Sequence, residues 1–299
     1  MVEMPGSLKK ARGFLDTARW YFMEMPAKQS LKNFDYSVAE GQMVVEMKSP
    51  TDYRVDLTLK LTTEKKKVGT IWFRMPEGQL LGVMQDRTKA LKYKKTPEYL
   101  GLPLVKPLLK GQPVSVMIRY RFHPGDFGMI PMPISPQLKY PLTVVGKCGE
   151  GYDLIFPGTH IKTETVQGLK NYTWEAPRPY QLHLLALHSP KRTYVKSGEQ
   201  NFYYYYHPAS EPNAKAVVDT LAETYLAQMK INGPLAYKDY YIVEVSPKLC
   251  PNPMGLGGII LVPNGQFKMY DQARANGILE NILLREWQGK KGDTVRQSR

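Results

Sequence analysis

Histidine side chains could ligate a metal ion or transfer a proton, and the chain contains five of them. They are His123, His160, His183, His188 and His207. His183 and His188 lie in or beside an apolar stretch with the pattern of a strand, where residues five apart point to opposite faces. The two cannot chelate one ion from a regular strand, so we expect core or surface histidines. His123 shares a turn with Asp126, but no serine or cysteine nucleophile that this pair could activate lies near it in the sequence.

Other catalytic motifs are also missing from the sequence. It contains no Gly-x-Ser-x-Gly, no Walker loop and no Gly-x-Gly-x-x-Gly. Its two cysteines, Cys148 and Cys250, are too few for a disulfide framework or a zinc cluster. Because the Walker loop and the Gly-x-Gly-x-x-Gly motif are absent, nucleotide-dependent catalysis is not expected.

The composition is that of a folded, turn-rich protein. The 299 residues are 42% hydrophobic and 11% aromatic, with 24 glycines and 24 prolines, which excludes a disordered chain, a coiled coil or collagen. No apolar run reaches the roughly 18 residues of a membrane span, and residues 1–10 lack the apolar core of a signal peptide. We expect neither element in this chain, and the compartment stays open.

The chain is basic, with 41 Lys and Arg against 27 Asp and Glu and a net charge of +14. Such a charge attracts nucleic acid, lipid headgroups or acidic protein. Clusters of lysines at 65–67 and 92–95 are typical of solvated loops. No basic groove with stacking aromatics is evident, so nucleic acid is not expected as a partner. Membrane association is expected only through a partner or an anionic surface.

The first half of the chain has the pattern of antiparallel strands. A helix capped by Ser7 is predicted to end before Pro26, after which apolar and polar residues alternate over 53–61 and again over 114–122. Shorter apolar strands are predicted at 68–73 and 80–84. Four prolines make 127–141 an extended connection. These patterns indicate a β-sandwich or β-saddle.

Further strands are predicted as a meander that ends near Ser189 and Pro190. Their ranges are 140–145, 152–156, 162–166, 171–174 and 182–187. A different pattern follows: an amphipathic helix over 214–229, strands at 240–245 and 259–262, and a helix over about 271–288. We therefore expect a helical segment at 1–36, a β-domain at 37–192 and a partial α/β domain at 193–299.

The order of these elements resembles the gluzincin zinc aminopeptidase family of the alanyl-aminopeptidase type, in its bacterial membrane-associated branch. The residues that carry the resemblance are Tyr172 to Glu175, Pro177, the tyrosines 203–206, the helix 213–230, Gly233, Pro234 and the strand 240–245. It covers roughly residues 53–289. The resemblance implies a mainly β fold, in which an antiparallel β-saddle or sandwich precedes a partial α/β thermolysin-like domain.

The resemblance also implies a peptide-binding strand edge. In the family a glycine-rich motif ends Met-Glu-Asn, and its carboxylate pairs with the free amine of the substrate. Here Gly255 and Leu256 follow Met254, so the anchor is absent. The expected peptide-binding edge comprises Met254, Gly255, Leu256, Gly257 and Gly258, although these residues also suit a simple turn into a buried strand. Exposed rings among tyrosines 203–206 could anchor a peptide on an edge strand, or could pack at the domain junction.

The family's zinc helix carries His-Glu-x-x-His followed by Trp-Gly. Aligning Trp287 and Gly289 on that ending puts Asn281 and Arg285 at the histidine positions and Ile282 at the glutamate position. A guanidinium has no lone pair for a cation, and no histidine follows residue 207 in any register. The family's third ligand would fall beyond residue 299. We therefore expect no catalytic residues, metal or cofactor in this chain.

Two functional hypotheses follow. The first is a non-catalytic, aminopeptidase-like protein that binds a peptide or protein partner. The alternative is a fragment or divergent member of a zinc-dependent aminopeptidase, whose activity and zinc depend on sequence outside this chain. Homodimer formation is also expected, because the helix 214–229 and the strand 259–262 of an incomplete domain would leave apolar surface to be covered.

Overall fold

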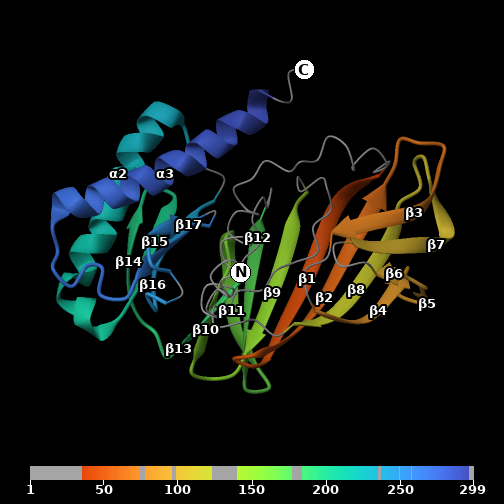
Figure 1. Ribbon diagram of the computed structural model, residues 1–299, viewed down its shortest axis with the longest axis horizontal. Helices are drawn as coiled ribbons and strands as arrows, with labels where there is room; N and C mark the ends of the chain where they lie inside the picture. The colour runs from red at the N-terminus through yellow and green to blue at the C-terminus, as the bar shows by residue number, and fades with distance from the viewer. Residues whose placement is uncertain are drawn as a thin grey trace, which may run out of the picture. The chain divides into compact units, whose positions relative to one another are not determined.

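The computed structural model describes residues 36–74, 78–95, 99–122, 140–176, 184–234, 237–248, 250–256 and 258–295 (Figure 1). The described residues belong to one compact unit, which begins at Tyr36. The predicted N-terminal helix, residues 127–139 of the proline-rich connection, His123 and His183 lie outside them. No described helix has the length and apolar character needed to cross a membrane.

An eight-stranded sheet forms the first part of this unit, in the order β11-β12-β9-β1-β2-β8-β4-β5. Its strands are β1 (Ser37–Ser49), β2 (Asp52–Thr62), β4 (Gln79–Gln85), β5 (Lys89–Ala90), β8 (Val114–Phe122), β9 (Leu142–Cys148), β11 (Thr159–Val166) and β12 (Leu169–Ala176). Neighbours are antiparallel except β1 and β9, which are parallel. The predicted alternation is confirmed in β2, where Tyr53, Val55, Leu57, Leu59 and Leu61 are all fully buried.

A three-stranded sheet adjoins this one and consists of β3 (Lys67–Arg74), β7 (Tyr99–Leu109) and β6 (Lys94–Lys95). β7 was not predicted, because Pro103 and Pro107 interrupt its pattern. A register shift between Val68 and Thr70 of β3 leaves residues 104–107 of β7 out of the pairing. Instead, Gln85 of β4 bonds to this part of β7. Its Oε1 accepts from the amides of Val105 (2.9 Å) and Lys106 (3.2 Å), and its Nε2 donates to the Lys106 carbonyl (3.0 Å).

The predicted meander is wrong in its connectivity. β10 (Tyr152–Ile155) leaves the eight-stranded sheet and pairs with β13 (Leu185–His188), while β9 pairs with β12. The reason is that β10 packs over β9 and does not extend its sheet. A Cβ on Gly146 of β9 would lie 2.8 Å from Leu154 Cδ1 and 2.9 Å from Trp174 Cζ3. β10 therefore covers the sheet where β9 has no side chain.

The α/β unit contains a five-stranded sheet in the order β14-β15-β16-β18-β17. Its elements are β14 (Lys191–Ser197), β15 (Gln200–Tyr206), the 3-10 helix Pro208–Asn213, α2 (Ala214–Asn232), β16 (Asp239–Val245), β17 (Met254–Gly255), β18 (Ile259–Pro263) and α3 (Gln272–Val295). β15, β16 and β18 are parallel, and the outer strands are antiparallel to their neighbours. The predicted fold class is confirmed: the chain is mainly β, with antiparallel sheets followed by an α/β unit.

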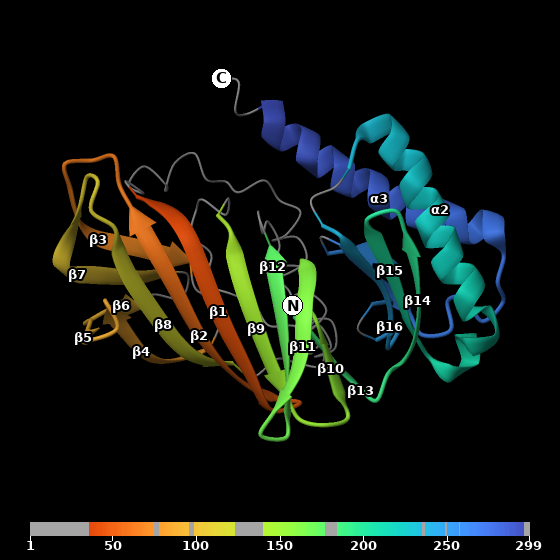
Figure 2. The same cartoon turned by 180° about the vertical axis from the view of Figure 1, so that it is seen from behind.

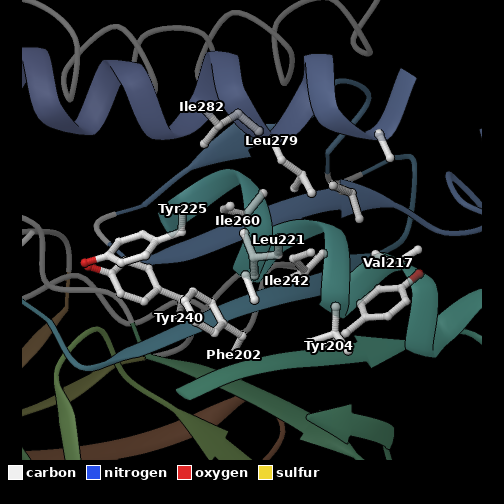
Figure 3. Packing of buried hydrophobic residues seen from close by; sticks show 14 of the residues in the cluster. Phe202, Tyr204, Val217, Leu221, Tyr225, Tyr240, Ile242, Ile260, Leu279 and Ile282 are labelled. Atoms are coloured by element: carbon white, nitrogen blue, oxygen red, sulfur yellow. The ribbon is translucent and has the colours of Figure 1, made fainter. Parts of the chain in front are cut away.

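The two faces of the five-stranded sheet are both covered. Phe202, Tyr240, Ile242 and Ile260 face α2 and α3 in one apolar cluster (Figure 3). On the other face, Tyr241, Val243 and Ile259 pack with Ile155 of β10 and Leu185 of β13. The tyrosines of β15 alternate between these faces, and β14 pairs with β15, so the tyrosine run is not on an edge strand. Its side chains pack within the sheet and at the junction.

A buried carboxylate joins the eight-stranded sheet to the five-stranded one. Asp239 of β16 accepts from the amide of His160 in β11 (2.6 Å) and from Nδ2 of Asn201 in β15 (2.8 Å). Burial raises the pKa of Asp239. The ring of His160 packs against Trp174, with centroids 6.1 Å apart, and its Nε2 lies 2.8 Å from Thr163 Oγ1. Burial lowers the pKa of His160.

Gln85 provides a test of how the two β-sheets are joined. In Gln85→Leu, three backbone groups of β7 lose their partner inside the fold, so we expect the free energy of unfolding to fall by about 2–4 kcal/mol. Gln79→Leu is the matched control, because Gln79 is exposed on the same strand. Urea denaturation of both variants measures the effect. Equal stabilities would show that β7 does not depend on Gln85.

His160 makes the stability of the junction depend on pH. Because its folded pKa lies below its ordinary value of about 6.5, the unfolded chain takes up the proton first, and stability falls as the pH drops. We expect the free energy of unfolding to decrease between about pH 7.5 and 5.5, and to decrease less in His160→Gln. Asp239, whose pKa is raised, acts in the opposite direction at lower pH. Equal slopes for the two proteins would contradict this prediction.

Candidate functional site

The expected peptide-binding residues form a hairpin at one edge of the five-stranded sheet. β17 pairs antiparallel with β18 through Met254 with Leu261 and Gly255 with Ile260. The amide of Leu256 donates to the carbonyl of Ile259 at 2.7 Å. Of the described strands, only β18 pairs with β17, so β17 is the edge of this sheet.

The register determines which backbone groups face outward at this edge. Opposed residues in an antiparallel pair alternate between hydrogen-bonded and non-hydrogen-bonded pairs. Leu256 and Ile259 are a hydrogen-bonded pair, so Gly255 and Ile260 are the non-hydrogen-bonded pair beside it. The N–H and C=O of Gly255 therefore point away from β18, toward the open edge.

The neighbours of Gly255 are held in place by packing. Leu256 is buried among Tyr241, Val243 and Leu261, and Met254 packs against the same cluster. Gly258 has a φ of +89°, and a Cβ on it would lie 3.2 Å from Tyr237 Cδ2, so this turn requires glycine. Met254 and Gly255 thus form the edge, Leu256 and Gly258 are buried behind it, and Gly257 lies outside the described residues.

Both cysteines are buried thiols. Burial raises the pKa of Cys148 and of Cys250 to about 11. The Sγ of Cys250 donates to the carbonyl of Asn252 at 2.9 Å, in the loop that precedes β17. Because the thiolate is the reactive form, neither cysteine is suited to act as a nucleophile.

Helix α3 carries the three residues that the resemblance places at zinc-binding positions. Ile282 is 6% exposed and lies with Leu279 on the side of the helix that faces the sheet (Figure 3). Asn281 and Arg285 are exposed, and Nδ2 of Asn281 donates to the Gly277 carbonyl at 2.8 Å. An isoleucine side chain offers no donor atom, and a guanidinium offers no lone pair. These residues do not fit a zinc ion.

The described histidines do not build another metal site. His188 and His207 line a hollow of about 310 Å³ together with Lys191 and Glu244. His207 uses Nδ1 to accept from the amide of Ala209, and His160 lies at the junction with Asp239. Within the described residues, no group of three or more His, Cys, Asp or Glu side chains is arranged to hold a metal ion.

Glu244 was missed by the sequence reasoning, although an acidic residue inside the apolar run 240–245 was a signal. Its Oε1 accepts from Tyr204 Oη (2.6 Å) and Ser210 Oγ (2.7 Å). Its Oε2 accepts from the amides of His207 (2.8 Å) and Gly265 (3.3 Å). With four donors already bound, this carboxylate fixes the turns at the ends of β15 and β18 and is not free to act as a base.

Comparison with known proteins finds similarity in structure only. No protein-family model matches the chain, and no curated protein matches it. A crystal structure of a mutant M1 zinc metallopeptidase from Deinococcus radiodurans superposes with a TM-score of 0.58 at 14% identity, over 82% of this chain and 63% of that one. A two-domain M1 zinc metallopeptidase mutant bound to L-arginine gives a TM-score of 0.57 at 14% identity, over 82% of this chain and 64% of that one.

The M1 zinc metallopeptidase of Deinococcus radiodurans itself gives a TM-score of 0.57 at 13% identity, again over 82% of this chain and 63% of that one. This chain therefore spans less than two thirds of the length of these structures. At such low identity the likeness establishes the fold and leaves the activity open. The described residues share the fold of M1 zinc metallopeptidases, and this chain carries Asn281, Ile282 and Arg285 where the resemblance expects the zinc motif.

Proposed function

We propose that this chain is a divergent relative of the M1 zinc metallopeptidases that binds extended peptides along β17 and does not hydrolyse them through α3. The observation that carries this proposal is the outward-facing backbone of Gly255, at the free edge of a sheet with the metallopeptidase fold. The fold likeness supports the relation to zinc aminopeptidases. The binding role rests on the edge alone.

The chemistry of the edge suggests how a peptide would be recognised. An added strand gains main-chain hydrogen bonds from Gly255, and these bonds do not depend on the side chains of the peptide. In the resembled family a glutamate of this motif pairs with the free amine of the substrate, and this chain has glycine at that position. We therefore propose that the edge accepts internal peptide segments as readily as free amino ends.

The alternative, a divergent zinc-dependent aminopeptidase, requires metal ligands that α3 does not supply. Such an enzyme would take its ligands and its zinc from sequence outside this chain. We also propose that this chain is related to the bacterial membrane-associated branch of the family. The two candidates differ in one measurable property, which is peptide hydrolysis by this chain alone.

Peptide binding can be tested by removing the outward N–H of Gly255. Proline is tolerated where the N–H faces away from the sheet, so Gly255→Pro removes one donor for the peptide and no hydrogen bond to β18. We expect its affinity for a fluorescein-labelled Val-Thr-Val-Thr-Val-Thr peptide to fall by about tenfold, the equivalent of one hydrogen bond of roughly 1.4 kcal/mol. Fluorescence polarisation measures the affinity.

Gly255→Ala is the matched control, because it keeps the N–H, and it should bind like the unchanged protein. Acetylation of the peptide's amino end should leave the affinity unchanged. Urea denaturation shows whether Gly255→Pro is still folded. Equal affinities of the proline and alanine variants, or no binding by the unchanged protein, would refute the edge as the binding site.

Zinc content tests the absence of metal chemistry. Because the donor set of α3 does not fit zinc, we expect about 0.1 zinc or less per chain after dialysis against a weak chelator. We also expect no release of p-nitroaniline from L-alanine p-nitroanilide. A content of about one zinc per chain that is lost in His188→Ala or His207→Ala would mean that these histidines form a metal site. Hydrolysis that depends on zinc would favour the aminopeptidase.

A further inference from the structure

The positive charge of the chain is concentrated in one part of the fold. Residues 64–110 contain eleven Lys and Arg against four Asp and Glu, which is a net +7 of the chain's +14. This segment forms β3 to β7, at the end of the eight-stranded sheet opposite to β11. Figures 1 and 2 both show β4, β5 and β6 grouped beside β8. Half of the net charge therefore lies on a small part of the molecule.

Apolar side chains are exposed among these lysines. Leu81 and Tyr93 are each 45% exposed. The β4–β5 register pairs Gln85 with Lys89 and Met84 with Ala90, and the Leu91 amide bonds to the Val83 carbonyl at 2.9 Å. The Nζ of Lys95 also bonds to the Gly78 carbonyl, so residues 91–95, which include Tyr93, run beside residues 78–83, which include Leu81. The pairing of β4 with β8 shifts between Leu80 and Gly82, which leaves Leu81 out of that ladder.

Exposed lysines lie on the same segment as Tyr93 and on β7. Lys92 and Lys94 flank Tyr93 along the chain, and Lys95 is held beside the start of β4 by a 2.7 Å bond from its Nζ to the Gly78 carbonyl. Lys106 lies in the part of β7 that Gln85 binds. We name Leu81, Tyr93, Lys92, Lys94, Lys95 and Lys106 the basic patch. It combines two exposed apolar side chains with four exposed lysines.

We propose that the basic patch docks on the surface of an anionic phospholipid bilayer, with its lysines at the headgroups and Leu81 and Tyr93 in the interfacial layer. Charge complementarity selects the anionic surface, because lysines near such a bilayer are attracted to it. The exposed apolar pair selects lipid over nucleic acid: tyrosine is favoured at the membrane interface, whereas Leu81 would gain nothing from a phosphate backbone.

Vesicle binding with matched lysine variants tests the electrostatic part. The probes are vesicles of phosphatidylcholine alone and of phosphatidylcholine with phosphatidylglycerol. We expect binding only to the anionic vesicles, with a steep loss as salt rises. Each lysine contributes about fivefold to partition, so replacing Lys92, Lys94 and Lys106 by glutamine should weaken it by about 100-fold. The control replaces Lys196, Lys248 and Lys268, exposed lysines of the α/β unit, and should change little.

The apolar part has its own readout. In Tyr93→Trp, the emission of the added tryptophan, taken as the difference from the unchanged protein, should shift to the blue when anionic vesicles are added. Leu81→Ser should weaken vesicle binding and leave binding to a DNA duplex unchanged. If the two triple-lysine variants lost vesicle binding equally, the binding would depend on net charge and not on the basic patch. If the emission of the Tyr93→Trp variant did not shift, residue 93 would not enter the interfacial layer. Either result overturns the proposal. Neither measurement involves peptide, so the outcome is independent of the edge at Gly255.

Discussion

Strand β16 is buried on both faces and carries a buried carboxylate near each end, and the α/β unit depends on satisfying these two groups. An unpaired carboxylate in such a position costs several kcal/mol. Asp239 is satisfied from β11 and β15, which joins the two large sheets. Glu244 is satisfied from Tyr204, Ser210 and the backbone after β15 and β18. The two carboxylates thus fix the neighbours of β16 at both ends.

Between these carboxylates, β16 presents apolar side chains to both faces, and this explains why α3 is a packing helix. Tyr240 and Ile242 need cover on one face, and α2 and α3 provide it with Leu221, Leu279 and Ile282. A glutamate at residue 282, as the zinc motif of the resembled family requires, would place a charge in that cluster. Ile282 therefore accounts both for the missing glutamate of the zinc motif and for the packing of α3 against the sheet.

The sequence predicted the elements whose burial follows a local period. The alternation in β2 and β8 and the spacing of apolar residues in α2, with Gly233 at its C-cap, correspond to what the structure contains. β14 was not predicted, because its residues, Lys-Arg-Thr-Tyr-Val-Lys-Ser, show no alternating apolar pattern and its pairing comes from β15. The pairing of β10 with β13 is not local, so a period could not reveal it. The candidate site was likewise predicted only in part. The residue types indicated the strand edge, but which backbone groups of Gly255 face outward depends on the register of β17 with β18.

The two proposed binding surfaces use different properties of sheet edges. Natural proteins protect exposed edges with lysines and bulges, and the end of the eight-stranded sheet at β4 and β5 has both, in Lys89 and in the shift at Leu81. An edge protected in this way does not add a strand, but its charge suits an anionic surface. β17 carries no charged side chain, and no described strand pairs with the outward N–H and C=O of Gly255. β4, which carries Leu81 of the basic patch, and β11, which contacts β16, lie toward opposite ends of the eight-stranded sheet. Docking through the patch would therefore not require any residue of the peptide edge, and a chain held at a bilayer would keep β17 available to peptides.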